Sequence, residues 1–333
     1  MSIDVHAHCV PTEVIESLVT DGGRYGIEVI QQDGRYAVLI GGRVQTRPIL
    51  PALLDLPGRI AAMDDTRVEV QVLSSWIDLT AYALDGDAGT RYARMFNEAL
   101  AATVAIAPER LRGLATVPLQ APERAASELR HAVSSLGLAG VEIATTVDGV
   151  ELDDQGLEPF WRVAEELRCL VLVHPYASLA GRRVTRYNLA NLVGNPAETT
   201  IALGHLVFGG VLERHPDLRL CLVHGGGFAP YQIGRWDHAA RHDAGGVAAD
   251  LGRLPSEWLH NLYFDTVLHS PASLRFLLDV VGADHVVLGS DYPFRMGDPE
   301  PVGTVEAVAG VGTVERALVL GGNLADILDG VLR

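Results

Sequence analysis

The sequence predicts an α/β protein whose eight parallel strands close into a (β/α)8 TIM barrel. Short runs rich in β-branched residues recur along the chain, and most precede a stretch with helical periodicity. The middle runs, such as 170–173, are almost wholly apolar, as expected for strands buried on both faces. An open doubly wound sheet would carry a Gly-rich phosphate turn after its first strand, but His6-Ala7-His8 stands there. These observations favour the closed barrel.

The expected elements alternate along the chain in the order that a parallel barrel requires. The strands are expected at Ile3–His6, Val70–Ser74, Leu114–Pro118, Gly140–Ile143, Leu170–His174, Leu218–His224, Leu262–Thr266 and Val286–Ser290. The clearest helical patterns are Thr90–Ala107, Glu123–Leu136, Glu158–Leu167, Pro196–Arg214 and Ser273–Val281. We therefore expect one barrel domain over residues 1–333.

One stretch departs from this alternation. Three short runs there look like antiparallel strands joined by turns at Asp33-Gly34 and Gly41-Gly42. The runs are Ile27–Ile30, Tyr36–Ile40 and Val44–Ile49. We interpret residues 20–56 as a small β insertion after the first barrel strand. An insertion at that end of a strand overhangs the active-site face of a barrel.

Composition narrows the classes of partner. The formal net charge is -16, from 42 acidic and 26 basic side chains, which disfavours nucleic acid and anionic membranes. No apolar run approaches the roughly 18 residues of a membrane helix, and no leader pattern follows Met1. Cys9, Cys169 and Cys221 are widely spaced without a CxxC pair, which is typical of free thiols. We expect a soluble, cytoplasmic protein.

Metal-binding side chains stand at the carboxyl ends of three predicted strands. They are His6 with His8, then His174, then Asp291. In a barrel these ends converge on one face, and residues i and i+2 of a strand point the same way. Three imidazoles and a carboxylate form a mixed donor set for which zinc is the first choice, with manganese, iron and cobalt as alternatives. The pattern predicts one divalent ion per subunit.

Each of these residues also has an ordinary explanation. A His-x-His triplet occurs often by chance, and His174 before Pro175 could be a core histidine with satisfied hydrogen bonds. Asp291 could cap a helix or form a turn. Their joint placement at strand ends favours the metal site.

A further histidine, His224, begins the segment His224-Gly225-Gly226-Gly227 after the sixth strand. The glycines allow a ligand to approach the backbone closely. A histidine beside a metal site is suited to move a proton, so we expect an acid/base role. The alternatives are a further metal ligand or a structural hydrogen-bond partner.

Several longer motifs carry a resemblance that covers nearly the whole chain. They are Asp4-Val5-His6-Ala7-His8 with Pro11, Arg59-Ile60 with Met63-Asp64, His174-Pro175, Pro196-Ala197-Glu198-Thr199-Thr200-Ile201, His224-Gly225-Gly226-Gly227 with Gly234-Arg235, and Asp291-Tyr292-Pro293-Phe294. By these motifs the chain resembles the amidohydrolase superfamily, and within it the amidohydrolase-related decarboxylases of the aminocarboxymuconate-semialdehyde decarboxylase type.

The resemblance implies an activity and a role for each site residue. The activity is non-oxidative decarboxylation of a small unsaturated or aromatic carboxylic acid; hydrolysis of an amide or lactone, or hydration, is the alternative. The implied zinc ligands are His6, His8, His174 and Asp291, with His224 and Asp291 catalytic. Arg47 would hold the substrate carboxylate, with Phe294 and Trp76 as further substrate contacts. Arg235 would reach the neighbouring active site of a homodimer.

The chain also departs from the family. It has Asn188 and Asn191 where the semialdehyde decarboxylases carry tryptophans, Thr46 replaces an aromatic residue, and the loop with Trp76 after the second strand also differs. We therefore expect a more polar chamber and a different acid as substrate. The fourth strand lacks the lysine that bridges two metals in related barrels, and the direction of Glu142 is open. A mononuclear site is expected, with His269 close enough to touch the pocket.

Overall fold

The computed structural model describes residues 1–32, 34–176, 181–243, 245–246 and 251–329. Eight parallel strands form one sheet in the order β1-β5-β6-β7-β10-β11-β12-β13. They are β1 (Ile3–Cys9), β5 (Val70–Ser75), β6 (Leu111–Ala115), β7 (Gly140–Ala144), β10 (Leu170–His174), β11 (Arg219–Leu222), β12 (Tyr263–Asp265) and β13 (Val286–Val287). The predicted barrel is confirmed, although the third strand was predicted three residues too late.

The two edge strands of the sheet meet through the chain that follows β13. The Val5 amide donates to the Leu288 carbonyl at 2.8 Å, and the Asp291 amide donates to the His6 carbonyl at 2.8 Å. These bonds close the barrel and place Asp291 directly beside the first strand.

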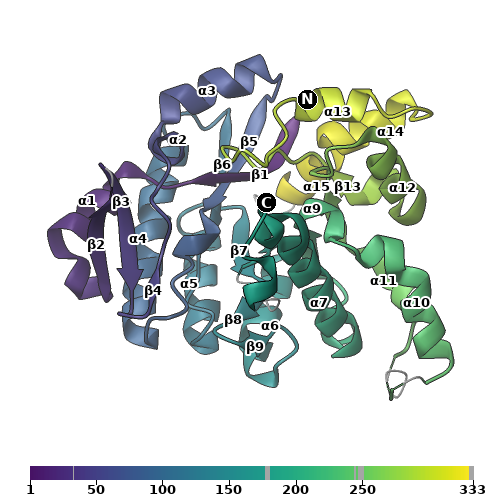
Figure 1. Ribbon diagram of the computed structural model, residues 1–333, viewed down its shortest axis with the longest axis horizontal. Coiled ribbons are helices and arrows are strands. Elements are labelled where there is room, and N and C mark those ends of the chain that lie inside the picture. Colours follow the sequence, from purple (N-terminus) through teal and green to yellow (C-terminus); the bar gives the residue numbers. More distant parts are fainter. Residues whose placement is uncertain (33, 177–180, 244, 247–250, 330–333) are drawn as a thin grey trace.

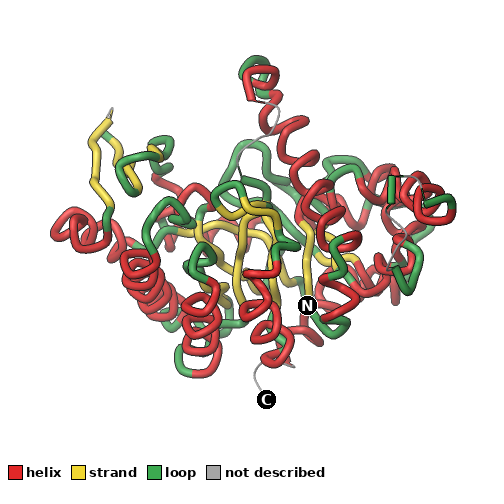
Figure 2. Tube along the Cα trace, turned by 90° about the horizontal axis from the view of Figure 1, so that it is seen from below, coloured by secondary structure: helices red, strands yellow, loops and turns green. Residues whose placement is uncertain are grey.

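Helices surround the strands, as the view in Figure 2 shows. The longer ones are α1 (Thr12–Asp21), α3 (Leu56–Asp65), α4 (Gly86–Val104), α5 (Pro122–Ser134), α6 (Glu158–Leu167), α7 (Asn195–Phe208), α10 (Ala229–Arg241) and α12 (Pro271–Val281). Shorter ones are α2 (Pro51–Leu54), α8 (Val211–Arg214), α11 (Pro255–Trp258), α13 (Pro301–Glu306), α14 (Thr313–Ala317) and α15 (Asn323–Asp329). Within the described residues, none is both long and apolar enough to span a membrane.

The insertion forms a separate antiparallel sheet beside the barrel (Figure 1). It consists of β2 (Ile27–Gln32), β3 (Arg35–Ile40) and β4 (Val44–Gln45). The third predicted run is shorter than expected as a strand, although the Thr46 and Ile49 amides still donate to the Val38 and Tyr36 carbonyls of β3. Asp33, half of the expected first turn, lies outside the described residues.

The barrel interior is filled by apolar side chains from alternate strand positions. Val72, Leu114 and Leu172 are all fully buried in one cluster, which Leu324 of α15 joins. The pairing register shifts between Asp4 and Ala7 on β1. Because of this shift, Asp4 pairs with Gln71 on the outer side while the histidines after it face inward.

Candidate metal centre

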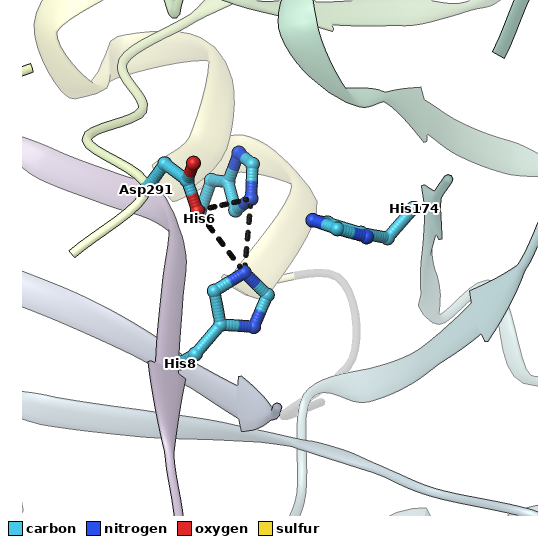
Figure 3. A group of neighbouring side chains, drawn as sticks. All are labelled: His6, His8, His174 and Asp291. Carbon is cyan, nitrogen blue, oxygen red and sulfur yellow. Dashed lines mark hydrogen bonds and ion pairs between the residues drawn. The ribbon is translucent and has the colours of Figure 1, made fainter. Parts of the chain in front are cut away.

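Four predicted side chains converge at the carboxyl ends of the strands. One donor atom from each of His6, His8, His174 and Asp291 lies within 4.8 Å of the others, and all four residues are buried. In Figure 3, His6, His8 and Asp291 form a linked group, and His174 extends toward them from a different strand. The structure thus brings together residues that are up to 285 positions apart in the sequence.

The spacing within this group suits a small cation. His6 Nε2 lies 3.2 Å from His8 Nε2, and Asp291 Oδ1 lies 3.5 and 3.3 Å from these two nitrogens. Donors about 2.0–2.1 Å from a zinc ion at tetrahedral angles lie about 3.3–3.4 Å apart. Three of the four donors therefore already stand at the spacing of a tetrahedral site.

Hydrogen bonds on the far side of each ring fix the imidazole tautomers. His6 Nδ1 donates to Asp265 Oδ2 at 2.7 Å, His8 Nδ1 to the Ser75 carbonyl at 2.9 Å, and His174 Nδ1 to the Pro175 carbonyl at 2.9 Å. A carbonyl or carboxylate can only accept, so each Nδ1 carries a proton, and each Nε2 is the atom that offers a lone pair to a metal when the ring is neutral. All three lone pairs are directed into the group.

The electrostatics fit a bound cation as well. Burial and the charges of His8 and His6 hold the pKa of His174 well below its ordinary value, so that imidazole is neutral. Burial alone would raise the pKa of Asp291, but the neighbouring imidazoles, His6 first, hold it well below its ordinary value. Its Oδ1 is buried and has no hydrogen-bond partner in the described structure. An ionised oxygen and facing lone pairs need a cation between them, so the residues fit a single divalent metal.

Glu142 points into the barrel but does not join this group. Its Oε1 lies 3.6 Å from His8 Nδ1, on the side of the ring away from the other donors, and accepts from Ser74 Oγ at 3.2 Å. Burial raises the pKa of Glu142 to about 7. The position leaves Glu142 beside a ligand rather than between two metals, in line with a mononuclear centre.

His224 lies beside the donor group at the start of a tight turn. Its backbone is left-handed, with φ 55, and its Nε2 is 3.9 Å from Asp291 Oδ2. Its buried Nδ1 has no partner in the described structure. The glycines after it serve the turn: a Cβ on Gly227 would stand 2.1 Å from the Pro196 carbonyl oxygen. The expected space for a ligand at this backbone is partly taken by the protein itself.

A cavity of about 620 Å³ opens from His224 and Asp291 between α10 and α12. His269 lines it, as expected, and so does Asn191. Most of the remaining wall is apolar, contributed by Leu192, Phe228, Pro230, Tyr231, Val267, Leu268, Ala272, Phe276, Leu277 and Met296. The wall of this cavity is thus mainly apolar, and the expectation of a chamber more polar than that of the semialdehyde decarboxylases stays a prediction.

The other residues behind that prediction lie elsewhere. Thr46 is buried within the insertion, where its Oγ1 accepts from the Val38 amide at 3.1 Å. Asn188 is exposed and does not line the cavity. Thr46 supports the backbone of the insertion, a role that single residue types in the sequence do not reveal.

The predicted substrate contacts lie on the opposite flank of the metal group. The centroid of the Phe294 ring lies 5.3 Å from that of His8 and 6.3 Å from that of the buried Trp76. The Arg47 guanidinium lies over the Trp76 ring, 5.2 Å from its centroid. These three side chains form a row that leads from the insertion to His8. Arg235 is exposed on α10, outside the cavity lining.

Sequence reasoning missed two supporting residues. Asp265 accepts from both His6 Nδ1 and the Gly225 amide, which ties the first ligand to the turn after His224. Arg59, fully buried on α3, donates to the His8 carbonyl and to Gln71 Oε1. Asp265 is a charged residue in an otherwise apolar strand. Such a residue needs a buried partner, and this was the signal by which the sequence could have indicated a supporting role.

The barrel and the three-histidine, one-carboxylate group define a metal-binding TIM-barrel protein. The chain belongs to the amidohydrolase family, whose model, described as Amidohydrolase, matches residues 3–329.

Comparison with individual proteins gives the same result. A 2-amino-3-carboxymuconate-6-semialdehyde decarboxylase of Dictyostelium discoideum is 35% identical, covering 81% of this chain and 75% of the relative. Its Caenorhabditis elegans counterpart is 27% identical, covering 98% and 94%. The solved 5-carboxyvanillate decarboxylase of Sphingomonas paucimobilis superposes with a TM-score of 0.83 at 25% identity, covering 98% of both chains.

Proposed function

We propose that the chain is a metal-dependent, non-oxidative decarboxylase, a carbon–carbon lyase that acts on a small aromatic or unsaturated carboxylic acid. The observation that supports this most directly is the convergence of the His6, His8 and His174 imidazoles with the Asp291 carboxylate, whose Oδ2 lies 3.9 Å from His224 Nε2. The relatives named above are decarboxylases of unsaturated or aromatic acids, which supports the same reaction and substrate class.

The ion that we assign to the site is zinc, held by His6, His8, His174 and Asp291. Three imidazole nitrogens and one carboxylate oxygen are donors that zinc prefers, in tetrahedral geometry. When bound, the ion supplies positive charge that stabilises the negative charge developing on the substrate as carbon dioxide leaves.

The residues of the chain perform the remaining steps. Arg47 binds and orients the substrate carboxylate, while Phe294 and Trp76 contact the unsaturated skeleton. The bond to the carboxylate breaks, its electron pair stays on the substrate carbon, and His224 delivers a proton to that carbon. Asp291 Oδ2 lies 3.9 Å from His224 Nε2, on the side of the ring that faces the metal group.

The test combines metal analysis with detection of carbon dioxide. We expect about one zinc per chain after reconstitution, and release of labelled carbon dioxide from carboxyl-labelled hydroxybenzoates or aminocarboxymuconate semialdehyde. Metal-loaded protein that hydrolyses amides or lactones, or hydrates double bonds, without releasing carbon dioxide would contradict the proposal and favour the hydrolase or hydratase alternative.

Replacing the acid/base residue separates chemistry from metal binding. For His224→Asn we expect full metal content and a decrease in kcat of about 10²–10⁴-fold, because the proton donor is lost. His205→Asn is the matched control, since His205 pairs with Asp153 on the surface and should leave kcat unchanged. Unchanged turnover in His224→Asn would remove this residue from the mechanism.

We further propose a homodimer in which Arg235 serves the partner's active site. Arg235 is exposed, and the described part of the chain provides it with no hydrogen bond or ion pair. It lies on α10, which also contributes Pro230 and Tyr231 to the cavity wall. A guanidinium on a chain of formal net charge -16 is a suitable second anchor for an anionic substrate.

A reducing, cytoplasmic compartment is part of the same proposal. All three cysteines are free and buried. Free thiols persist where glutathione and thioredoxin keep them reduced, which supports this location.

A further inference from the structure

Arg47, the residue proposed to bind the substrate carboxylate, is exposed, yet its guanidinium is held in one position. Arg47 follows β4 of the insertion, and 71% of its side chain is accessible. Its guanidinium lies over the Trp76 ring, 5.2 Å from the centroid. A long cationic side chain with this exposure would normally sample many rotamers. A partner is therefore needed to keep the guanidinium in this position.

Asp78 forms an ion pair with the Arg47 guanidinium. Asp78 lies in a short 3-10 helix, η2 (Ile77–Leu79), just after β5 and Trp76. Arg47 Nε donates to Asp78 Oδ2 and Nη2 donates to Asp78 Oδ1, both at 3.2 Å. Only 15% of the Asp78 side chain is exposed, and among the described residues Arg47 is its sole charged partner.

The mode of pairing leaves the arginine able to bind a second anion. Nε and Nη2 lie on the side edge of the guanidinium, and their bonds use two of its five N–H groups. The end edge, formed by Nη1 and the second N–H of Nη2, has no protein partner in the described structure. That edge presents two parallel donors at the spacing of a carboxylate.

We propose that Asp78 is the positioning residue for Arg47, fixing its guanidinium over Trp76 so that the end edge receives the substrate carboxylate. The inference rests on the proposed role of Arg47 in substrate binding. Asp78 itself acts only through Arg47. The row from Asp78 through Arg47, Trp76 and Phe294 then sets the distance between the carboxylate anchor and His8.

A second ion pair of the insertion provides the control that distinguishes a positioning role of Asp78 from a purely structural one. The same insertion is tied to the barrel by a second ion pair, in which Arg43 Nη2 lies 3.0 Å from Asp148 Oδ2. Asp148→Asn is therefore a matched control: it removes one carboxylate charge from an ion pair of the same insertion. Asp148 has a φ of 50, a conformation that asparagine also tolerates.

The experiment measures binding of salicylate, and of neutral salicylamide, to the zinc-loaded full chain by calorimetry. Variants are Asp78→Asn, Arg47→Gln, the double variant and Asp148→Asn. We expect Asp78→Asn to weaken salicylate binding about tenfold, as the loss of a charge-assisted orienting bond would, and to leave salicylamide unchanged. In the Arg47→Gln background, Asp78→Asn should have no further effect.

Each other outcome overturns the proposal or its basis. Unchanged or tighter salicylate binding in Asp78→Asn would show that Asp78 does not hold Arg47 for the ligand. A loss that persists in the Arg47→Gln background, or appears equally in Asp148→Asn, would assign Asp78 a structural role. If Arg47→Gln alone leaves salicylate binding unchanged, the role of Arg47 fails instead. Asp78→Glu, which keeps the charge, serves as a second variant if Asp78→Asn does not fold, and partial retention of salicylate affinity is expected.

Discussion

At the scale of single residues, the metal donors are polar groups that stand at the ends of buried apolar runs. His6, His8 and His174 end or follow runs of buried aliphatic residues, and Asp291 follows the last one. Asp265 also ends an apolar run, at β12, but the sequence does not name its partner His6, which lies 259 positions away. A supporting carboxylate acquires its meaning only from the fold.

The Asp265 contact predicts a measurable effect on metal affinity. Asp265→Asn weakens the acceptor that keeps the proton on His6 Nδ1, so we expect metal affinity to fall about 10–100-fold. Competition with a chromogenic chelator measures this directly. Asp284→Asn, an exposed neighbour of His285, is the control and should leave the affinity unchanged; equal affinities in all three proteins would refute the tautomer argument.

The buried arginine makes a second prediction at this scale. Arg59→Met removes donors from the His8 carbonyl and from Gln71 while leaving both acceptors buried. We expect the free energy of unfolding to fall by about 2–4 kcal/mol. Denaturant titration tests this, with Arg130→Met, which loses only an exposed pair with Glu166, as the comparison. A loss no larger than that of the control would mean that water replaces the guanidinium.

At the scale of elements, the positions of the strands could be predicted from the apolar runs, whereas the ends of several helices and strands could not. The helix expected over Pro196–Arg214 ends at Phe208, because Gly210 takes a φ of 72 and separates α7 from α8. The strand expected over Leu218–His224 ends at Leu222, because His224 and the glycines after it adopt left-handed conformations. These turns depend on contacts with distant backbone, which periodicity does not encode.

Two glycine substitutions, one in the turn after β11 and one inside α7, should change the stability in opposite directions. Gly227→Ala places a methyl group against the Pro196 carbonyl at a φ of 65, so we expect a loss of about 2 kcal/mol or more. Gly204→Ala, inside α7, meets only Trp236 at 3.8 Å and should stabilise the protein by about 0.5–1 kcal/mol. Thermal unfolding of both variants decides the matter, and a tolerated Gly227→Ala would show that the turn can rearrange.

At the scale of the whole molecule, the barrel could be predicted from eight repeated units, but the shape of its chamber could not. The expectation of polarity came from Asn188, Asn191, Thr46 and Trp76, of which only Asn191 lines the cavity. Which residues face a cavity depends on how loops from several strands pack together. The sequence therefore identified the chemistry of the centre better than its walls.

The proposed dimer makes a prediction about mixed subunits. Arg235→Ala and His224→Asn should each be nearly inactive as pure proteins. Co-refolded together, they should recover up to about a quarter of wild-type activity, because random pairing gives half heterodimers and each of these has one intact site. Light scattering should show a dimer throughout. Activity that is absent from the mixture would indicate that Arg235 serves its own subunit.

The bonds that join β1 to the chain after β13 have a consequence for how this protein matures. The residues of its metal site come from β1, from β10 and from the chain after β13, so a ribosome-bound chain cannot assemble the full set before Asp291 has emerged. Tight metal uptake thus reports completion of the barrel rather than an early local event. A truncated or misassembled chain would keep isolated histidines without the enclosure that makes them a site.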